Sequence, residues 1–400
     1  MEKKKVALAI NYDYHDYGGM LQAFATQRAL TKIGVDSETI DFDSLKDDIN
    51  KRKWKYFLSN IFDLTIVKEK GRVIAKKIRT RLNGNLKEKL SERDAAFDAF
   101  CKKGFKVSQK FGSWQALTNG CRKYDAVIVG SDQLWLPSNV MGDYYTLNFV
   151  PSDVRKIAYA TSFGIGAVPE KMKGQYAQYL SRIECLSARE TSGQDIIKQC
   201  VGRDVPLVCD PTMLLEKEDW SEIATEKRII KEDYVFCYFM GDNPEQREFV
   251  KRLAKAKDLK IVALLHLDQY IAADEDYVDY APYNISPADF VNLVKNANYI
   301  CTDSFHGTVF SIIFSRNFFT FKRFNKKASL STNTRLTSLL NRLGLNERLY
   351  TGEESVDGSL DVCNYEKVQQ NLKAFRADSF SYLKKSIGLK KNDKSSLCVR

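Results

Sequence analysis

Short apolar runs rich in β-branched residues alternate with amphipathic stretches along most of the chain. Residues 6–11 have the pattern of a buried strand, 19–33 that of a helix with one apolar face, and 35–42 that of a second strand. Such alternation is typical of parallel strands joined by crossover helices. The same patterns predict strands or extended segments at 126–129, 156–161, 185–188, 205–209, 234–240, 260–265, 298–302 and 318–321, and helices at 170–183, 194–200, 245–255, 286–295, 307–314 and 365–384.

The alternation restarts after Trp220, which predicts an α/β protein of two doubly wound, Rossmann-like domains with ligands bound between them. We expect the N-terminal domain over 1–220, the C-terminal domain over 221–345, and a C-terminal helix and tail over 346–400. A helical insertion is expected over about 44–110. One large α/β domain with insertions is the alternative.

The insertion concentrates positive charge. Residues 51–110 hold 18 Lys or Arg and six Asp or Glu, a net charge of +12, whereas the whole chain carries +11. The start of this segment mixes cations with Trp54, Tyr56 and Phe57, which suits a helix lying on an anionic membrane surface. A solvated helical insertion whose aromatic side chains pack on the domain is the plainer interpretation. Nucleic acid is a weaker candidate, because no recognition motif is present.

Composition narrows the class of protein. The 400 residues are 44% hydrophobic and 12% aromatic, which is enough for substantial cores and excludes a disordered or collagenous chain. The nine cysteines form no close pair, which argues against a zinc site or disulfide framework and favours reduced, buried cysteines. No apolar run approaches the roughly 18 residues of a spanning helix. We therefore expect a cytoplasmic protein that at most lies peripherally on the inner face of the membrane.

Polar or glycine-rich turns follow several predicted strands directly. In an open parallel sheet, ligands bind beyond the carboxyl ends of the strands, so these turns should line one cleft. Each turn also has a plain structural interpretation as a cap or connector, and a tight turn is the plainer interpretation of the glycine pair. The turns comprise Asn11 with Gly18-Gly19, Gly130 to Trp135, Ser162 to Gly164, Arg189-Glu190, Asp210 to Thr212, and Asp303 to Gly307.

His306 is the most specific candidate among the three histidines. It opens a predicted helix beside Gly307, which permits close approach of the backbone. Histidine suits proton transfer near neutral pH. The alternative is a structural histidine bonded to a neighbouring loop. His15 is undecided between the two interpretations, and His266, at the end of an apolar strand, is interpreted as structural.

Together these turns resemble the polysaccharide pyruvyltransferase family. The resemblance spans about residues 6–325, with the motifs in order. It implies two Rossmann-like domains arranged as in glycosyltransferases of the B class. It also implies phosphoenolpyruvate as the donor and a sugar of a surface glycan or its lipid-linked precursor as the acceptor. The matching motifs run from Asp16 to Ala23, Gly130 to Trp135, Tyr159 to Gly164, Ser187 to Glu190, Asp210 to Thr212, and Thr302 to Gly307.

Two positions match residues to which the family assigns functions. Arg189 matches an arginine that contacts the donor phosphate or carboxylate, and His306 matches a histidine proposed as donor contact or acid/base. The chain departs from the family at Ser304, where many members have an arginine. The candidates for the missing cation are Lys322, Arg323 and Arg335.

The implied reaction defines what the site must contain. Phosphoenolpyruvate carries about three negative charges near neutral pH, so binding it requires cations and helix N-termini. We expect Arg189 to bind the donor and His306 to act as general acid/base, while Asp132 or Asp303 orients the sugar hydroxyls. The other substrate contacts that we expect are Asn11, Gly18, Gly19, Gln133, Ser304 and Gly307.

Two other functions compete with this one. A nucleotide-sugar glycosyltransferase of the same architecture would need a ribose-binding carboxylate, for which Asp303 and Glu245 are candidates. A basic adaptor would bind lipid or nucleic acid through 51–110. No cofactor is implied, and a dependence on divalent metal is left open because no strong ligand cluster is present.

Overall fold

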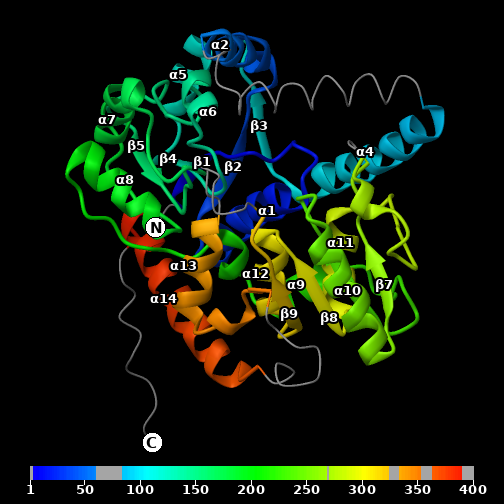
Figure 1. The fold of residues 1–400 in the computed structure, drawn as a ribbon. Helices are drawn as coiled ribbons and strands as arrows, with labels where there is room; N and C mark the ends of the chain where they lie inside the picture. The colour runs from blue at the N-terminus through cyan, green and yellow to red at the C-terminus, as the bar shows by residue number, and fades with distance from the viewer. Residues whose placement is uncertain (1–2, 60–82, 268–269, 324–332, 353–362, 390–400) are drawn as a thin grey trace, which may run out of the picture.

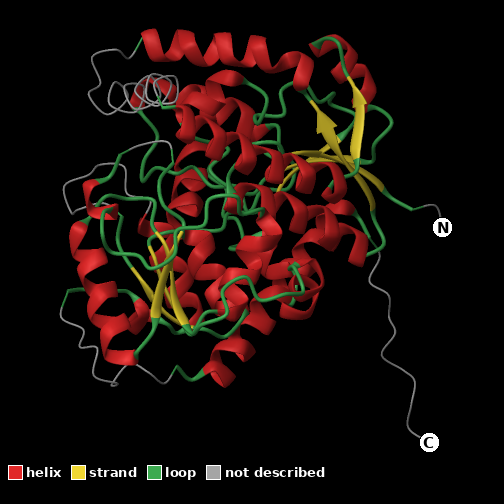
Figure 2. Ribbon diagram, turned by 90° about the vertical axis from the view of Figure 1, so that its right-hand side faces the viewer, coloured by secondary structure: helices red, strands yellow, loops and turns green. Residues whose placement is uncertain are grey.

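A computed structural model of the chain describes residues 3–59, 83–267, 270–323, 333–352 and 363–389. Within these residues the named strands form two parallel sheets, one in each half of the chain (Figure 1). Figure 2 shows the sheets on opposite sides of the molecule, with helices packed between and around them. The prediction of two doubly wound, Rossmann-like halves is therefore confirmed. The domain limits at 220 and 345 stay predictions.

The first sheet forms the N-terminal half and has the strand order β3-β2-β1-β4-β5. All four neighbouring pairs are parallel. The inner strands β1 and β4 are apolar and almost wholly buried, as expected where helices cover both faces of a sheet. The five strands are β1 (Lys5–Ala9), β2 (Asp36–Asp41), β3 (Val107–Lys110), β4 (Ala126–Val129) and β5 (Arg155–Ala158).

The extended segments predicted at 185–188 and 205–209 do not form full strands. They join the edge of the sheet only through isolated bridges, Ile157 to Cys185 and Ala188 to Leu207. Pro206 has no backbone N–H to donate, so a continuous ladder cannot form there. The two segments nevertheless place Arg189 and Asp210 at the same edge as the carboxyl end of β5.

The second sheet forms the C-terminal half and has the order β7-β6-β8-β9, again all parallel. Its strands are β6 (Tyr234–Tyr238), β7 (Lys260–Ala263), β8 (Tyr299–Thr302) and β9 (Asn317–Thr320). Its helices are α10 (Pro244–Lys257), α11 (Pro287–Asn296) and α12 (Phe305–Ile313). The helix predicted from 307 thus begins two residues earlier, because the Ser304 hydroxyl caps it.

The other helices lie mainly around the first sheet. Helix α1 begins at Tyr17, so the glycine pair predicted as a turn lies in its first helical turn. The short helices α5, α6, α9 and α13 were not predicted. The bounds are α1 (Tyr17–Lys32), α5 (Trp114–Cys121), α6 (Pro137–Gly142), α7 (Lys173–Ser181), α8 (Thr191–Val201), α9 (Lys217–Ile223) and α13 (Asn333–Leu343).

The insertion is helical in its described parts, α2 (Lys46–Leu58) and α4 (Gly84–Gly104). Much of the basic segment, residues 60–82, lies outside the described residues. Trp54 is 48% exposed on α2. Helix α4 reaches from the N-terminal half across to α11 (Figure 1). The ammonium of Lys89 on α4 lies 5.1 Å from the ring centre of Tyr283, in the loop before α11. None of the described helices combines the length and the hydropathy needed to span a bilayer.

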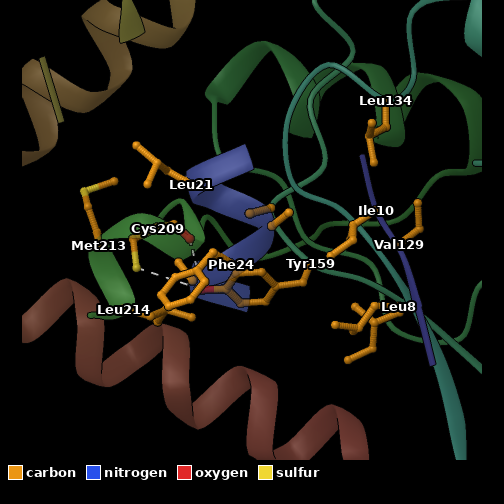
Figure 3. Packing of buried hydrophobic residues seen from close by; sticks show 14 of the residues in the cluster. Leu8, Ile10, Leu21, Phe24, Val129, Leu134, Tyr159, Cys209, Met213 and Leu214 are labelled. Carbon is orange, nitrogen blue, oxygen red and sulfur yellow. Dashed lines mark hydrogen bonds between the residues drawn. The ribbon is translucent and has the colours of Figure 1, made fainter. Parts of the chain in front are cut away.

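A continuous core joins the two halves. Figure 3 shows Leu21 and Phe24 of α1 packed beside the short helix η3 (Pro211–Leu214), where the Tyr159 hydroxyl donates to the carbonyl of Cys209 at 2.9 Å. Helix α14 (Tyr365–Ile387) also spans both halves. Its Gln369 side chain donates to the carbonyl of Ile312, and its Ser379 hydroxyl accepts from the amide of Cys209. This packing sets the positions of the two carboxyl edges relative to each other.

Candidate active site between the two sheets

The carboxylate of Asp210 lies at the centre of a buried polar cluster. Its Oδ2 accepts from Nη1 of Arg189 at 2.7 Å and from the hydroxyl of Ser131 at 2.9 Å, and lies 3.6 Å from Nε2 of His306. Its Oδ1 accepts from the amide and hydroxyl of Thr212 at 3.0 and 2.7 Å. Arg189 and Ser131 belong to the N-terminal half and His306 to the C-terminal half, so the predicted convergence of distant loops occurs around one oxygen atom.

Arg189 is surrounded by carboxylates, and only its Nε has no hydrogen-bond partner in the described structure. Besides Asp210, its guanidinium lies 3.3 Å from Oδ1 of Asp132 and 3.5 Å from Oε2 of Glu190, and its Cζ lies 4.6 Å from the centre of the Phe305 ring. The side chain is 1% exposed. Burial would lower the pKa of Arg189, but the three carboxylates outweigh it and raise that pKa. Arg189 is therefore first of all the counter-ion of this carboxylate cluster.

The carboxylates respond differently to the same cations. Burial would raise the pKa of Asp210, but His306 and Arg189 lower it far below its usual range. Burial also opposes ionisation of Asp132, and Arg189, His306 and Arg335 together lower the pKa of that carboxyl. For Glu190 burial prevails and raises the pKa. Asp132 and Asp210 are therefore ionised near neutral pH.

His306 packs directly on the first turn of α1. A Cβ atom on Gly18 would lie only 2.0 Å from Nδ1 of His306, so this contact between the halves requires glycine. Nε2 of His306 has no hydrogen-bond partner among the described residues. Asp16 caps α1 by accepting from the Gly19 amide at 2.6 Å, and burial, followed by the charge of Asp132, raises the pKa of Asp16. The Gly19 amide predicted to bind substrate is thus already bonded to Asp16.

The turn after β8 is held by its own side chains. The Ser304 hydroxyl accepts from the amide of Gly307 at 3.3 Å, and a Cβ on Gly307 would lie 2.5 Å from the Thr302 hydroxyl. The two oxygens of Asp303 accept from the amides of Met240 and Gly241 at 2.6 and 2.9 Å. These contacts favour structural roles for Ser304, Gly307 and Asp303 over direct contact with substrate.

Arg335 is a buried cation without a carboxylate partner among the described residues. It lies on α13, is 6% exposed, and its Cζ is 5.9 Å from the Phe305 ring that Arg189 also contacts. With the amide of Gln133 oriented so that its oxygen faces the guanidinium, that oxygen accepts from Nη1 at 2.7 Å and from Nη2. Nε has no partner in the described structure. Burial, followed by the charge of Arg189, lowers the pKa of Arg335 to about 9, so it still carries its charge at neutral pH.

The structure brings most of the predicted site residues together and adds others. Asp132, Arg189, His306 and Gln133 lie in or beside the cluster, and a Cβ on Gly19 would lie 3.8 Å from the amide nitrogen of Asn11. Sequence reasoning did not single out Asp210 as the centre or Asp16 as a buried neighbour. The Asp-Pro turn and the position of Asp16 just before a glycine pair were the available signals. In the described part of the chain, no three or more His, Cys, Asp or Glu side chains are placed so that they could hold a metal ion together.

Fold and site together define an α/β protein of two Rossmann-like halves with a buried charged cluster between their carboxyl edges. The family model for polysaccharide pyruvyl transferase matches residues 16–323, and the chain belongs to this family. Membership indicates a transferase that acts in the pyruvylation of polysaccharides. No curated protein matches the chain.

The chain is similar to several solved structures, here with TM-scores below 0.5. A Listeria monocytogenes protein described as a UDP-N-acetylglucosamine 2-epimerase has a TM-score of 0.49 at 10% identity, with 100% of both chains covered. UDP-GlcNAc 2-epimerase of Neisseria meningitidis has a TM-score of 0.47 at 11% identity, covering 94% of this chain and 99% of that one. The wall teichoic acid polymerase TagF has a TM-score of 0.47 at 11% identity, covering 97% and 88%.

Replacing Gly18 by alanine should disrupt the contact between the halves. The new methyl group would displace His306 or the start of α1, and we expect a loss of about 1–3 kcal/mol in the free energy of unfolding. Urea denaturation measures this loss. Gly174→Ala on α7 is the matched control, because nothing lies within 4 Å of its added Cβ and alanine favours helix. Equal effects of the two substitutions would show that the contact of Gly18 with His306 does not require glycine.

Proposed function

We propose that the protein transfers the enolpyruvyl unit of phosphoenolpyruvate to a sugar of a surface polysaccharide or its lipid-linked precursor, and that it forms a pyruvate ketal and releases phosphate. Family membership supports pyruvyl transfer to a polysaccharide. The observation that supports an anionic donor most directly is Arg335, because a buried guanidinium with no ion pair to a carboxylate of the described residues is costly unless an anion binds it. Arg335 is also a candidate for the cation that the family carries at the position of Ser304.

Arg323 completes the cationic side of the site. Its Nε lies 3.9 Å from Oδ1 of Asp303, and its side chain is 22% exposed. Asp132 is exposed to a similar degree, at 23%, whereas Arg189 and Asp210 are almost inaccessible. The donor would therefore approach along Arg323 and Asp132 and place its phosphate or carboxylate against Arg335. The charge-assisted hydrogen bonds formed there are stronger than those between neutral groups.

The reaction requires two hydroxyl protons to be moved. In the proposed mechanism the donor methylene carbon gains a proton and becomes the methyl group, which leaves C2 cationic. A sugar hydroxyl adds to C2, the C2–O bond to phosphate breaks with its electron pair leaving on phosphate, and a second hydroxyl closes the ketal. The two sugar hydroxyls release two protons. One replaces the proton that the methylene carbon gained, and the other leaves on phosphate. His306 would carry these protons, with Asp210 stabilising its cationic form and Asp132 orienting a hydroxyl.

The nucleotide-sugar alternative has less support. Both oxygens of Asp303, one of its two candidate ribose ligands, are bonded to backbone amides. The other candidate, Glu245, is exposed in the first turn of α10. Contact of the basic segment with an anionic membrane stays a prediction.

Incubation with phosphoenolpyruvate and a set of lipid-linked sugars should add a pyruvate mass to one sugar and release phosphate. In parallel, phosphoenolpyruvate at about 100 times its Kd should stabilise the fold by about 2.7 kcal/mol, since a ligand that binds only the folded state shifts unfolding by mass action. Thermal unfolding with a panel of nucleotide sugars is the comparison. Stabilisation by a nucleotide sugar and not by phosphoenolpyruvate would refute the proposed donor.

The same substitution at two arginines should have opposite effects on the ligand-free protein. Arg335→Met removes an unpaired buried charge, so the ligand-free stability should be unchanged or higher, while the donor KM rises roughly 10- to 100-fold for the lost charged hydrogen bonds. Arg189→Met leaves three carboxylates uncompensated and should cost about 3–5 kcal/mol. Arg342→Met, at a half-exposed arginine further along α13, is the control. Destabilisation by Arg335→Met with an unchanged donor KM would exclude Arg335 from donor binding.

His306→Ala should lower kcat by about 10²- to 10⁴-fold, the usual contribution of general acid–base catalysis. Alanine fits against Gly18, so the variant should fold and should retain most of the stabilisation by phosphoenolpyruvate. Steady-state kinetics and thermal unfolding of one preparation give both values. Near-normal turnover would show that His306 is not the proton carrier.

A further inference from the structure

A cavity lies next to the charged cluster, between α4 and the loops that follow β6 and β7. Its volume is about 180 Å³, below the roughly 300–1,000 Å³ typical of pockets for drug-sized ligands, so it suits one small ring. Its walls combine aromatic and polar side chains, an arrangement that accommodates an amphipathic ligand. The lining residues that bear on its function are Tyr14, Asp16, Arg93, Phe97, His266 and Tyr283.

A chain of hydrogen bonds through Asp274 and Arg247 fixes the orientation of the His266 ring. Its Nδ1 lies 2.8 Å from Oδ2 of Asp274, whose Oδ1 accepts from Nε and Nη2 of the buried Arg247 at 3.1 and 2.7 Å. Burial would raise the pKa of Asp274, but the hydrogen bonds from His266 and Arg247 outweigh it and lower that pKa. An ionised carboxylate only accepts, so Nδ1 is the donor of this pair.

The other nitrogen of His266 is left without a partner. The side chain is 10% exposed, and Nε2 is buried with no hydrogen-bond partner among the described residues. His266 lines the cavity whereas Asp274 does not, so the side of the ring opposite Asp274 borders the cavity. In the neutral ring Nε2 is an acceptor, and a hydroxyl group of a ligand would satisfy it.

Asp16 connects the cavity to the charged cluster. It lines the cavity, and the charges of Asp132, His306 and Arg323 all act on its carboxyl. It also caps the helix whose Gly18 contacts His306. A ring in the cavity would therefore have one edge beside the groups to which we assign proton transfer and donor binding.

We propose that this cavity is the acceptor subsite and that it holds one pyranose ring of the glycan. Tyr14, 66% exposed at the cavity, covers an apolar face of the ring, and Nε2 of His266 accepts from a ring hydroxyl. Arg93 and Phe97 of α4 form one wall, so the basic insertion helps to bind the acceptor. This assignment rests on the proposed function. It specifies that the acceptor of the proposed reaction is a neutral sugar ring with free hydroxyls.

Saturation-transfer NMR without donor tests the assignment directly. The probes are methyl β-galactopyranoside, methyl β-glucopyranoside and β-linked oligosaccharides of galactose and of glucose. At least one should bind the wild-type protein and bind about tenfold more weakly to His266→Phe, which keeps a ring but removes the acceptor nitrogen. Tyr14→Ala should weaken binding as well. Trp54→Ala, at an exposed aromatic residue that does not line the cavity, is the control and should leave binding unchanged.

Stabilisation by phosphoenolpyruvate, measured on the same samples, should be equal in all four proteins, because the donor contacts lie elsewhere. If phosphoenolpyruvate does not stabilise the wild-type protein although a saccharide binds to it, the result counts against the proposed donor and not against the cavity. Saccharide binding that is equal in wild type, His266→Phe and Tyr14→Ala would overturn the acceptor subsite. The absence of binding by every saccharide probe would overturn it too.

Discussion

The contact of one buried carboxylate, Asp210, with a guanidinium and an imidazole is the constraint on which the rest of the site depends. Arg189 comes from the N-terminal half and His306 from the C-terminal half, and both face the same oxygen. Removing such charges from water is costly, and only close partners offset that cost. The two halves must therefore dock with their carboxyl edges facing. Gly18 permits this docking because His306 occupies the space that any larger side chain would need.

The two arginines that contact the Phe305 ring perform different tasks. Arg189 is surrounded by three carboxylates, whereas Arg335 contacts an amide oxygen and no carboxylate of the described chain. An arginine in the first environment maintains the fold of the site. One in the second environment favours a bound anion. In our proposal this separation explains how the chain can carry Ser304 where relatives have an arginine, since the cation is supplied from α13.

The basic insertion gains a second interpretation from the structure. Its charge and aromatic residues alone favour a membrane surface or a solvated helix. Helix α4, however, crosses to the C-terminal half and lines a cavity with Arg93 and Phe97. His266, which its apolar surroundings in the sequence marked as structural, lines the same cavity, and its buried Nε2 has no hydrogen-bond partner among the described residues. In this proposal, donor and acceptor meet at Asp16, where the cavity and the charged cluster adjoin.

The sequence by itself determined the alternation of strands and helices, the two parallel sheets, and the gathering of Asp132, Arg189 and His306 at their carboxyl ends. These features depend on local periodicity and on the rule that parallel strands end at a common edge. Only the tertiary structure decided which cation is paired and which is not, that Asp210 is central, and that Gly18 packs against His306. Those properties depend on distances of a few ångströms between residues that can be more than a hundred positions apart, and neither periodicity nor spacing along the chain contains them.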